Sequence, residues 1–253
     1  MKKNTINSQE YSFTEAEWQV RTDLAAAYRL VAFFGWDDLV FTHLSARVPG
    51  PEHHFLLNPY GSLFHEITAS SLVKVNEEGE IVGHDHSGRI NPAGFTIHSA
   101  VHMGRENAGA VIHLHAADGV AVSAHKKGLL PISQTAMLCL EHLSYHDFEG
   151  VALNLDERER LINDLGDKSM MLLRNHGVLT VGENVAECFT YLYFLMKACE
   201  IQVKAQSCGP VWMPSEQAIL ETAKQSKSLG KSAKLTWPAL LRLIDSKSPG
   251  YAV

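Results

Sequence analysis

The 253-residue sequence lacks several patterns that mark common functional classes. It has no G-x-G-x-x-G fingerprint and no P-loop, so no site for a dinucleotide or a nucleoside triphosphate is recognisable. Its Lys and Arg residues are dispersed and the net charge is −6, which argues against nucleic acid as a partner. No window approaches about 18 uninterrupted apolar residues, so we expect no membrane span.

Cysteine is also scarce. The four cysteines (Cys139, Cys188, Cys199 and Cys208) form no C-x-x-C pair, which favours buried or free thiols in a reducing compartment. The first residues contain two lysines but no apolar segment, so they do not resemble a secretory signal. We therefore expect a cytoplasmic protein, with a flexible arm at residues 1–11 followed by a single domain over residues 12–253.

The hydrophobic content is sufficient for one large core. At 45% hydrophobic residues, a chain of this length buries roughly 70–75% of its unfolded surface, so folding does not require a metal. Predicted strands and helices alternate along the chain without an internal repeat or a linker, which indicates one layered α/β domain. Helices are predicted over residues 14–34, 95–103, 117–126, 156–165, 183–205 and 237–244, and strands over 39–48, 54–57, 71–75, 109–115, 170–173 and 178–181.

The most informative motif is His113-Leu114-His115, which lies in the apolar run 110–122. In a strand, residues two apart project from the same face, with Cα atoms about 7 Å apart, so one metal ion can bind both imidazoles. A third imidazole, His176, stands where the apolar run 170–173 breaks. Three neutral histidines with open positions are typical of a catalytic metal site. The pair alone is also compatible with two hydrogen-bonded histidines near a surface.

A second pair of histidines, His98 and His102, falls four residues apart in the predicted helix 95–103. Such a pair can chelate a metal, but the glutamate that accompanies it in zinc proteases is absent. We therefore favour the alternative that both are hydrogen-bonded residues of a pocket. Asn91-Pro92 precedes the helix and is a typical helix start.

Six stretches, taken together, resemble the class II aldolase/adducin family, and its adducin-like branch more than the sugar-phosphate aldolases. They are FTHLSARVPGPEHHFLLNPYG, NPAGFTIHSAVHMGRENAGAVIHLHA, GLLPISQ, YHDFEG, LLRNHGVLTVGE and WPALLRLID, in the family's order. The resemblance implies a three-layer α/β/α domain with a mostly antiparallel central sheet, and a homotetramer. It also implies a divalent metal on His113, His115 and His176, with zinc as the first expectation and manganese or iron as alternatives.

The sequence departs from the family's pattern at the catalytic carboxylate. Aldolases of the family carry a Ser-Ser-Glu triplet where this chain has Pro92, Ala93 and Gly94. Gly94 thus stands in place of the glutamate that moves the substrate proton. Of the family's Gly-Asn-x-Ser phosphate-binding segment, only Ser45 is kept. The resemblance therefore does not predict a sugar-phosphate aldolase of the usual mechanism. The residues expected to bind substrate are Ser45, Asn58, Gly61, Gly94 and His98.

These observations leave three functional hypotheses. In the first, the chain is a metal-dependent lyase or isomerase acting on a small carbonyl or hydroxy-acid substrate, and His98 is a candidate for the missing acid/base. The helix start at Gly94 would then favour a substrate carboxylate over a phosphate. In the second, the same histidines bind Fe(II) in an oxygenase. In the third, the chain is a non-enzymatic assembly module, as adducin domains are.

Overall fold

The computed structural model describes residues 13–83, 89–150 and 156–253, and at residues 92–94 only the backbone. The arm expected at residues 1–11 lies outside them. A seven-stranded sheet runs through these residues in the order β3-β2-β1-β4-β7-β6-β5. Only β5 and β6 are parallel among its neighbouring pairs, so the expected mostly antiparallel sheet is confirmed. The strands are β1 (His43–Arg47), β2 (Phe55–Leu57), β3 (Val73–Val75), β4 (Ala110–Leu114), β5 (Leu143–His146), β6 (Met170–Leu173) and β7 (Gly177–Gly182).

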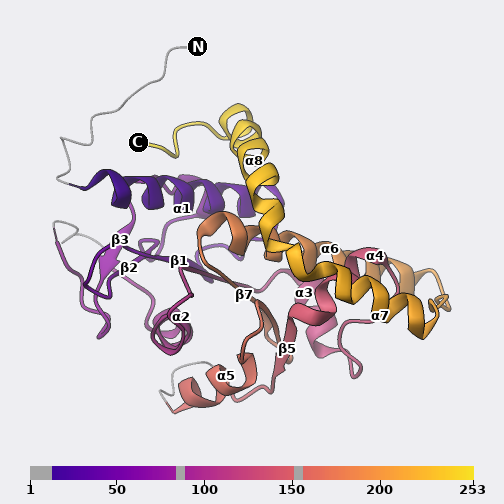
Figure 1. Cartoon of the computed structure of the whole chain (residues 1–253). Coiled ribbons are helices and arrows are strands. Elements are labelled where there is room, and N and C mark those ends of the chain that lie inside the picture. Colours follow the sequence, from indigo (N-terminus) through magenta and orange to yellow (C-terminus); the bar gives the residue numbers. More distant parts are fainter. Residues whose placement is uncertain (1–12, 84–88, 151–155) are drawn as a thin grey trace.

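Helices cover both faces of this sheet and produce the expected three layers (Figure 1). Helices α1, α6 and α8 lie on one face, and α2 and α5 lie on the other. The helices are α1 (Glu15–Phe33), α2 (Pro92–Gly104), α3 (Ala117–Ala124), α4 (Gln134–Cys139), α5 (Glu157–Leu165), α6 (Val185–Ser207), α7 (Glu216–Gln225) and α8 (Ala233–Lys247). Among the described residues, no helix has both the length and the apolar character needed to cross a membrane.

Alternating strand residues separate two buried cores. Leu44 and Ile112 point into the larger core beneath α1 and α6, together with Phe189. Val111 and Leu179 point into the smaller core beneath α2 and α5. Because side chains alternate between the faces of a sheet, the odd-numbered residues of β1 and β4 face α2. This parity places His113 toward the α2 side, and His115 follows directly after the end of β4.

The predicted element bounds are correct for the longest helices and wrong at several turns. Thr14 caps α1 as its sequence predicts, and its Oγ1 accepts a hydrogen bond from the Glu17 amide at 3.1 Å. The strand predicted over residues 39–48 is too long, because Leu39 and Thr42 adopt φ values of 52° and 67° in a turn. Strand β1 therefore begins only at His43. Strand β5 and helices α4 and α7 were not predicted.

Candidate functional site

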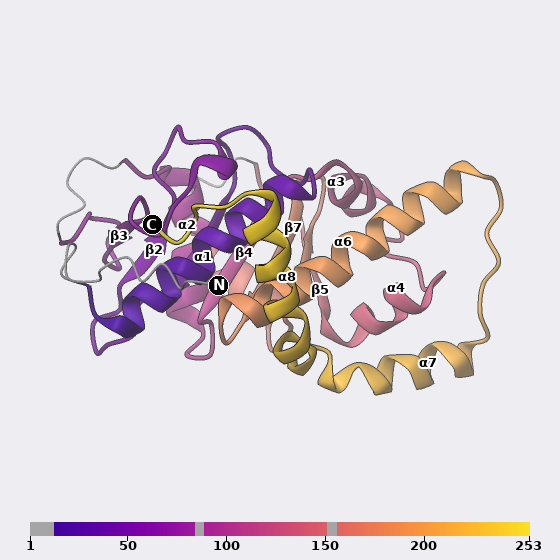
Figure 2. The ribbon, with the colours of Figure 1, turned by 90° about the horizontal axis from the view of Figure 1, so that it is seen from above.

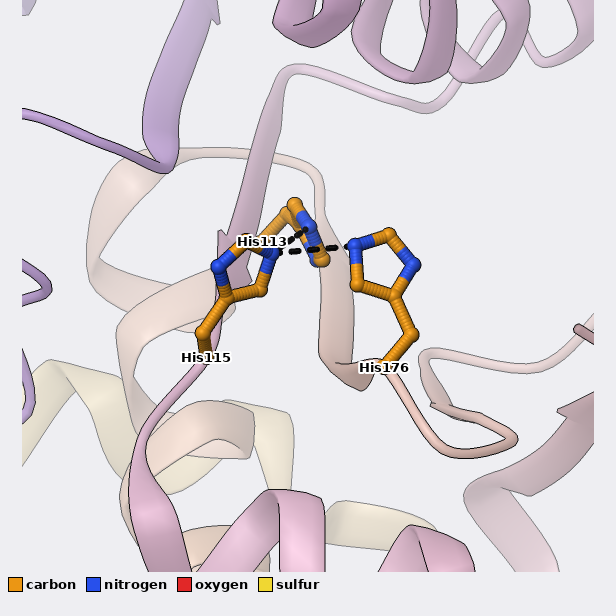
Figure 3. Close-up of side chains that lie close together, drawn as sticks. All are labelled: His113, His115 and His176. Carbon is orange, nitrogen blue, oxygen red and sulfur yellow. Dashed lines mark hydrogen bonds between the residues drawn. The ribbon is translucent and has the colours of Figure 1, made fainter. Parts of the chain in front are cut away.

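Three histidines converge where β4 ends and β7 begins. His113 lies in β4, His115 follows it, and His176 occupies the turn before β7. Strands β4 and β7 are antiparallel neighbours, so the end of one meets the start of the other. The Nε2 atom of His115 lies 3.1 Å from that of His113 and 2.9 Å from that of His176. Figure 3 shows the three rings turned toward one another, as the sequence predicts.

The Nδ1 atoms of His113 and His115, which face away from the centre of the cluster, each have a fixed hydrogen-bond acceptor. The Nδ1–H group of His113 donates to the Val178 carbonyl at 3.0 Å, and that of His115 donates to Asp38 Oδ2 at 3.1 Å. A neutral imidazole with its proton on Nδ1 has only a lone pair on Nε2. Two lone pairs that face each other cannot form a hydrogen bond, whereas a cation between them satisfies both. The donor set therefore fits a divalent metal ion.

Burial favours the neutral form of His113 and His176. The pKa of His113 is held well below its usual 6.5, first by burial and then by the neighbouring His176 and His115. Burial, with His115 next to it, lowers the pKa of His176 to about 4. Metal ligation requires the unprotonated imidazole, so at neutral pH no proton has to leave these two rings before a cation binds.

Asp38 was not predicted from the sequence. It lies in the loop between α1 and β1, 77 residues from its partner His115, and its turn context gives no sign of a role in the site. A carboxylate that accepts the second N–H group of a ligating histidine fixes the ring and raises its basicity. Asp38 is therefore suited to support His115 without contacting a metal itself.

Ser45 connects the two histidines of α2. Its Oγ lies 2.5 Å from His98 Nδ1 and 2.7 Å from His102 Nε2. His102 Nδ1 donates to the Ala108 carbonyl at 2.9 Å. All three side chains are buried. The geometry agrees with the interpretation of His98 and His102 as hydrogen-bonded residues rather than as a chelating pair.

His43 is a further residue that the sequence analysis did not single out. Its ring lies 5.8 Å from the His98 ring, centroid to centroid, and its strand partner is His113. Burial, and then the neighbouring His115, lower its pKa to about 4. Neither ring nitrogen of His43, nor Nε2 of His98, has a hydrogen-bond partner among the described residues. The two-residue periodicity that relates His43 to Ser45 in a strand was the signal available.

The remaining predicted site residues are less closely connected to the three histidines. Asn58 is buried, but its Oδ1 accepts a hydrogen bond from the Tyr28 hydroxyl at 2.9 Å. Gly61 lies exposed in a turn with φ of 101°. Gly94 lies in the first turn of α2, at a position where only the backbone is described. Substrate binding by these three residues remains a prediction.

Comparison with known proteins assigns the chain to a family. Residues 22–203 match the model of the class II aldolase and adducin N-terminal domain. A protein of Caulobacter vibrioides with a provisional class 2 aldolase name is 58% identical over 242 residues, covering 94% of both chains. Rat alpha-adducin is 46% identical over 208 residues, which cover 80% of this chain but 28% of that protein. An aldolase II superfamily protein from Pseudomonas syringae, known from a crystal structure, is 48% identical in sequence. The two structures superpose with a TM-score of 0.92 over 96% of this chain and 98% of that protein's chain. The chain therefore belongs to the class II aldolase/adducin family.

Proposed function

We propose that the chain is a metal-dependent enzyme, a lyase or isomerase that acts on a small carbonyl or hydroxy-acid substrate. The observation that supports this most directly is the convergence of the Nε2 atoms of His113, His115 and His176, two of them with Nδ1 held by a fixed acceptor. Zinc is the first expectation for the cation, with manganese or iron as alternatives.

A bound divalent cation would act as a Lewis acid on a carbonyl or hydroxyl oxygen of the substrate. The chain's own residues orient the site: the Val178 carbonyl fixes the ring of His113, and Asp38 fixes that of His115. Gly94 offers no carboxylate, so His98 is the proposed proton-transfer residue. The first backbone N–H groups of a helix have no intrahelical partner, so the start of α2 would favour a substrate carboxylate. With Pro92 and Ala93 in place of the family's phosphate-binding serines, sugar phosphates are not the expected substrates.

Two alternatives remain. The same three histidines could hold Fe(II) in an oxygenase, because imidazole ligands with open positions also suit that metal. A non-enzymatic assembly role is favoured by the similarity to alpha-adducin together with the missing carboxylate at Gly94.

We further propose a cytoplasmic homotetramer. Its location is supported by Cys139, Cys188 and Cys199, which are buried free thiols.

Elemental analysis of the protein purified without chelators separates these functions. The proposal predicts about one zinc or manganese ion per chain, retained through gel filtration. Iron at that stoichiometry would support the oxygenase, and a metal-free protein that also fails to take up added zinc would support the assembly module. A thermal-shift screen of the zinc-loaded protein with hydroxy acids, their decarboxylated analogues and sugar phosphates then identifies the substrate class.

A further inference from the structure

We propose that His43 and His98 form an uncharged subsite beside the three-histidine cluster, and that this subsite binds a free hydroxyl group of the substrate, with His98 Nε2 as the hydrogen-bond acceptor. This inference rests on the proposed function, because it specifies the substrate class of that site. Nε2 of His98 and both ring nitrogens of His43 are buried polar atoms without a partner among the described residues. Such groups in native proteins ordinarily have a partner, so they indicate a missing one.

A chain of hydrogen bonds fixes which nitrogen of His98 carries the proton. His102 Nδ1 lies 2.9 Å from the Ala108 carbonyl, which can only accept, so that nitrogen must carry the proton. A neutral His102 then has a lone pair on Nε2, and the Ser45 hydroxyl must donate its proton to it. Ser45 Oγ can therefore only accept at His98 Nδ1, 2.5 Å away. It follows that His98 Nε2 bears a lone pair.

The identity of this free atom restricts the ligand. A lone pair on His98 Nε2 binds a group that donates a hydrogen bond, and a phosphate dianion or a carboxylate offers no such proton. His43 has one donor and one acceptor in either tautomer. A substrate hydroxyl can donate to His98 while its oxygen accepts from His43.

The position of His43 and His98 indicates where the substrate hydroxyl would lie relative to the proposed metal ion. His43 is the strand partner of His113, and its ring meets the His98 ring edge-on. A substrate whose carboxylate or carbonyl oxygen lies at the three-histidine cluster would therefore place a nearby hydroxyl against His98. The inferred class is a small hydroxy acid or hydroxy carbonyl compound without a phosphate group.

The first test reads the tautomer of His98 by nitrogen NMR, using chelator-treated protein in which the histidines carry ¹⁵N. The His98 signals are assigned by their loss in His98→Gln. We expect the proton on Nδ1, a loss of that preference in Ser45→Ala, and a shift of the Nε2 resonance when glycolate is added but not when acetate is added. A proton on Nε2 in the wild-type protein, or equal shifts with both acids, would overturn the inference. Since no metal is present, this result is independent of the proposed function.

The second test measures binding to zinc-loaded protein by calorimetry, with glycolate, acetate and phosphoglycolate as probes. One hydrogen bond to a neutral acceptor corresponds to about a tenfold change in affinity. We expect glycolate to bind at least about tenfold more tightly than acetate, and phosphoglycolate no more tightly than glycolate. His98→Phe should abolish the preference for glycolate without loss of zinc, whereas the exposed control His53→Phe should keep it.

If glycolate is still preferred equally in zinc-loaded His98→Phe, its hydroxyl is held by the metal alone and the subsite is wrongly assigned. Tighter binding of phosphoglycolate would likewise contradict an uncharged subsite. Failure of the wild-type protein to take up zinc would instead count against the proposed function, and the NMR experiment would then decide the inference separately.

Discussion

At the scale of single residues, the hydrogen-bond partners of each histidine decide which of its ring nitrogens is available to a ligand. His113 and His115 each donate from Nδ1 to a fixed oxygen, which turns Nε2 toward the other ring. His102 also donates from Nδ1, but its Nε2 is satisfied by Ser45. His43 has no partner at either nitrogen among the described residues. The partner therefore decides which of these rings is structural and which is available to a ligand.

The burial of His102 makes stability depend on pH. Burial lowers its pKa from 6.5 in the unfolded chain to about 3 in the folded protein. The unfolded state therefore binds more protons in this window, and the stabilisation present above pH 6.5 is lost as the pH falls toward 3. When the pH falls from 7 to 5, the unfolding free energy of the wild type should decrease by about 2 kcal/mol more than that of His102→Gln. Urea unfolding at both pH values measures this difference. The exposed variant His53→Gln should behave as the wild type, and an unchanged pH dependence in His102→Gln would refute the prediction.

At the scale of elements, the sequence predicts those segments whose periodicity is strong and whose ends carry caps. Helix α6 shows this best: its stripe of buried residues, including Phe189 and Leu192, follows the predicted helical spacing. Strand β5 was missed because it is a four-residue edge strand whose middle residues, Ser144 and Tyr145, are only partly buried. Helix α7 was missed because it is largely exposed and polar.

The candidate site shows the same limits. The three-histidine cluster could be predicted because two of its members are two residues apart and a third interrupts an apolar run. Asp38 could not be predicted, because its partner is distant in the sequence and the turn at Leu39 and Thr42 brings it into place. His43 lies two residues before Ser45 in β1, so strand periodicity was the one sequence signal that relates it to the site.

The turn that presents His176 depends on Gly177. A Cβ atom at this position would lie 2.3 Å from the Leu114 carbonyl oxygen, so strands β4 and β7 would have to separate. Because His115 follows that carbonyl and His176 precedes the glycine, we expect Gly177→Ala to lower both the melting temperature and the zinc content. Val178→Ala is a matched control: its side chain belongs to the opposite core, so it should lower stability yet retain zinc. Full zinc binding by Gly177→Ala would contradict this account of the turn.

At the scale of the whole molecule, helices α6 and α7 extend away from the sheet (Figure 2). Exposed apolar side chains lie on α7 and on the connection that precedes it, among them Leu220. Trp212, in the connection between α6 and α7, is 90% exposed. A groove of about 450 Å³ lies between α6 and α8, lined by Phe34, Thr190, Tyr193, Phe194, Thr236, Ala239, Leu240 and Leu243. Trp237, in contrast, is buried within its own chain and donates to Asp23 at 2.9 Å. Helix α8 therefore offers another chain two kinds of apolar surface: Leu235, which is 81% exposed, and the partly buried Leu240 and Leu243 in the groove.

Exposed apolar patches of this kind are typical of protein–protein interfaces. We predict that the protein is a homotetramer, so light scattering at micromolar concentration should give four times the chain mass of 28.0 kDa. Leu240→Arg should reduce this mass if the groove lies in an interface, whereas a charge change at the exposed Lys234 should not. A monomeric mass for the wild-type protein would rule out the assembly.

The metal content of His115→Ala tests the central claim most directly. His115 lies between the other two histidines, within 3.1 Å of each Nε2 atom, so its loss removes the ligand that joins the set. The wild-type protein is expected to hold one divalent ion per chain after zinc loading and gel filtration. His115→Ala should lose most of it with an unchanged circular dichroism spectrum, because a core of this size does not depend on the metal, and His53→Ala should retain it. Full metal occupancy in a folded His115→Ala protein would contradict the assignment of His113, His115 and His176 as the metal site.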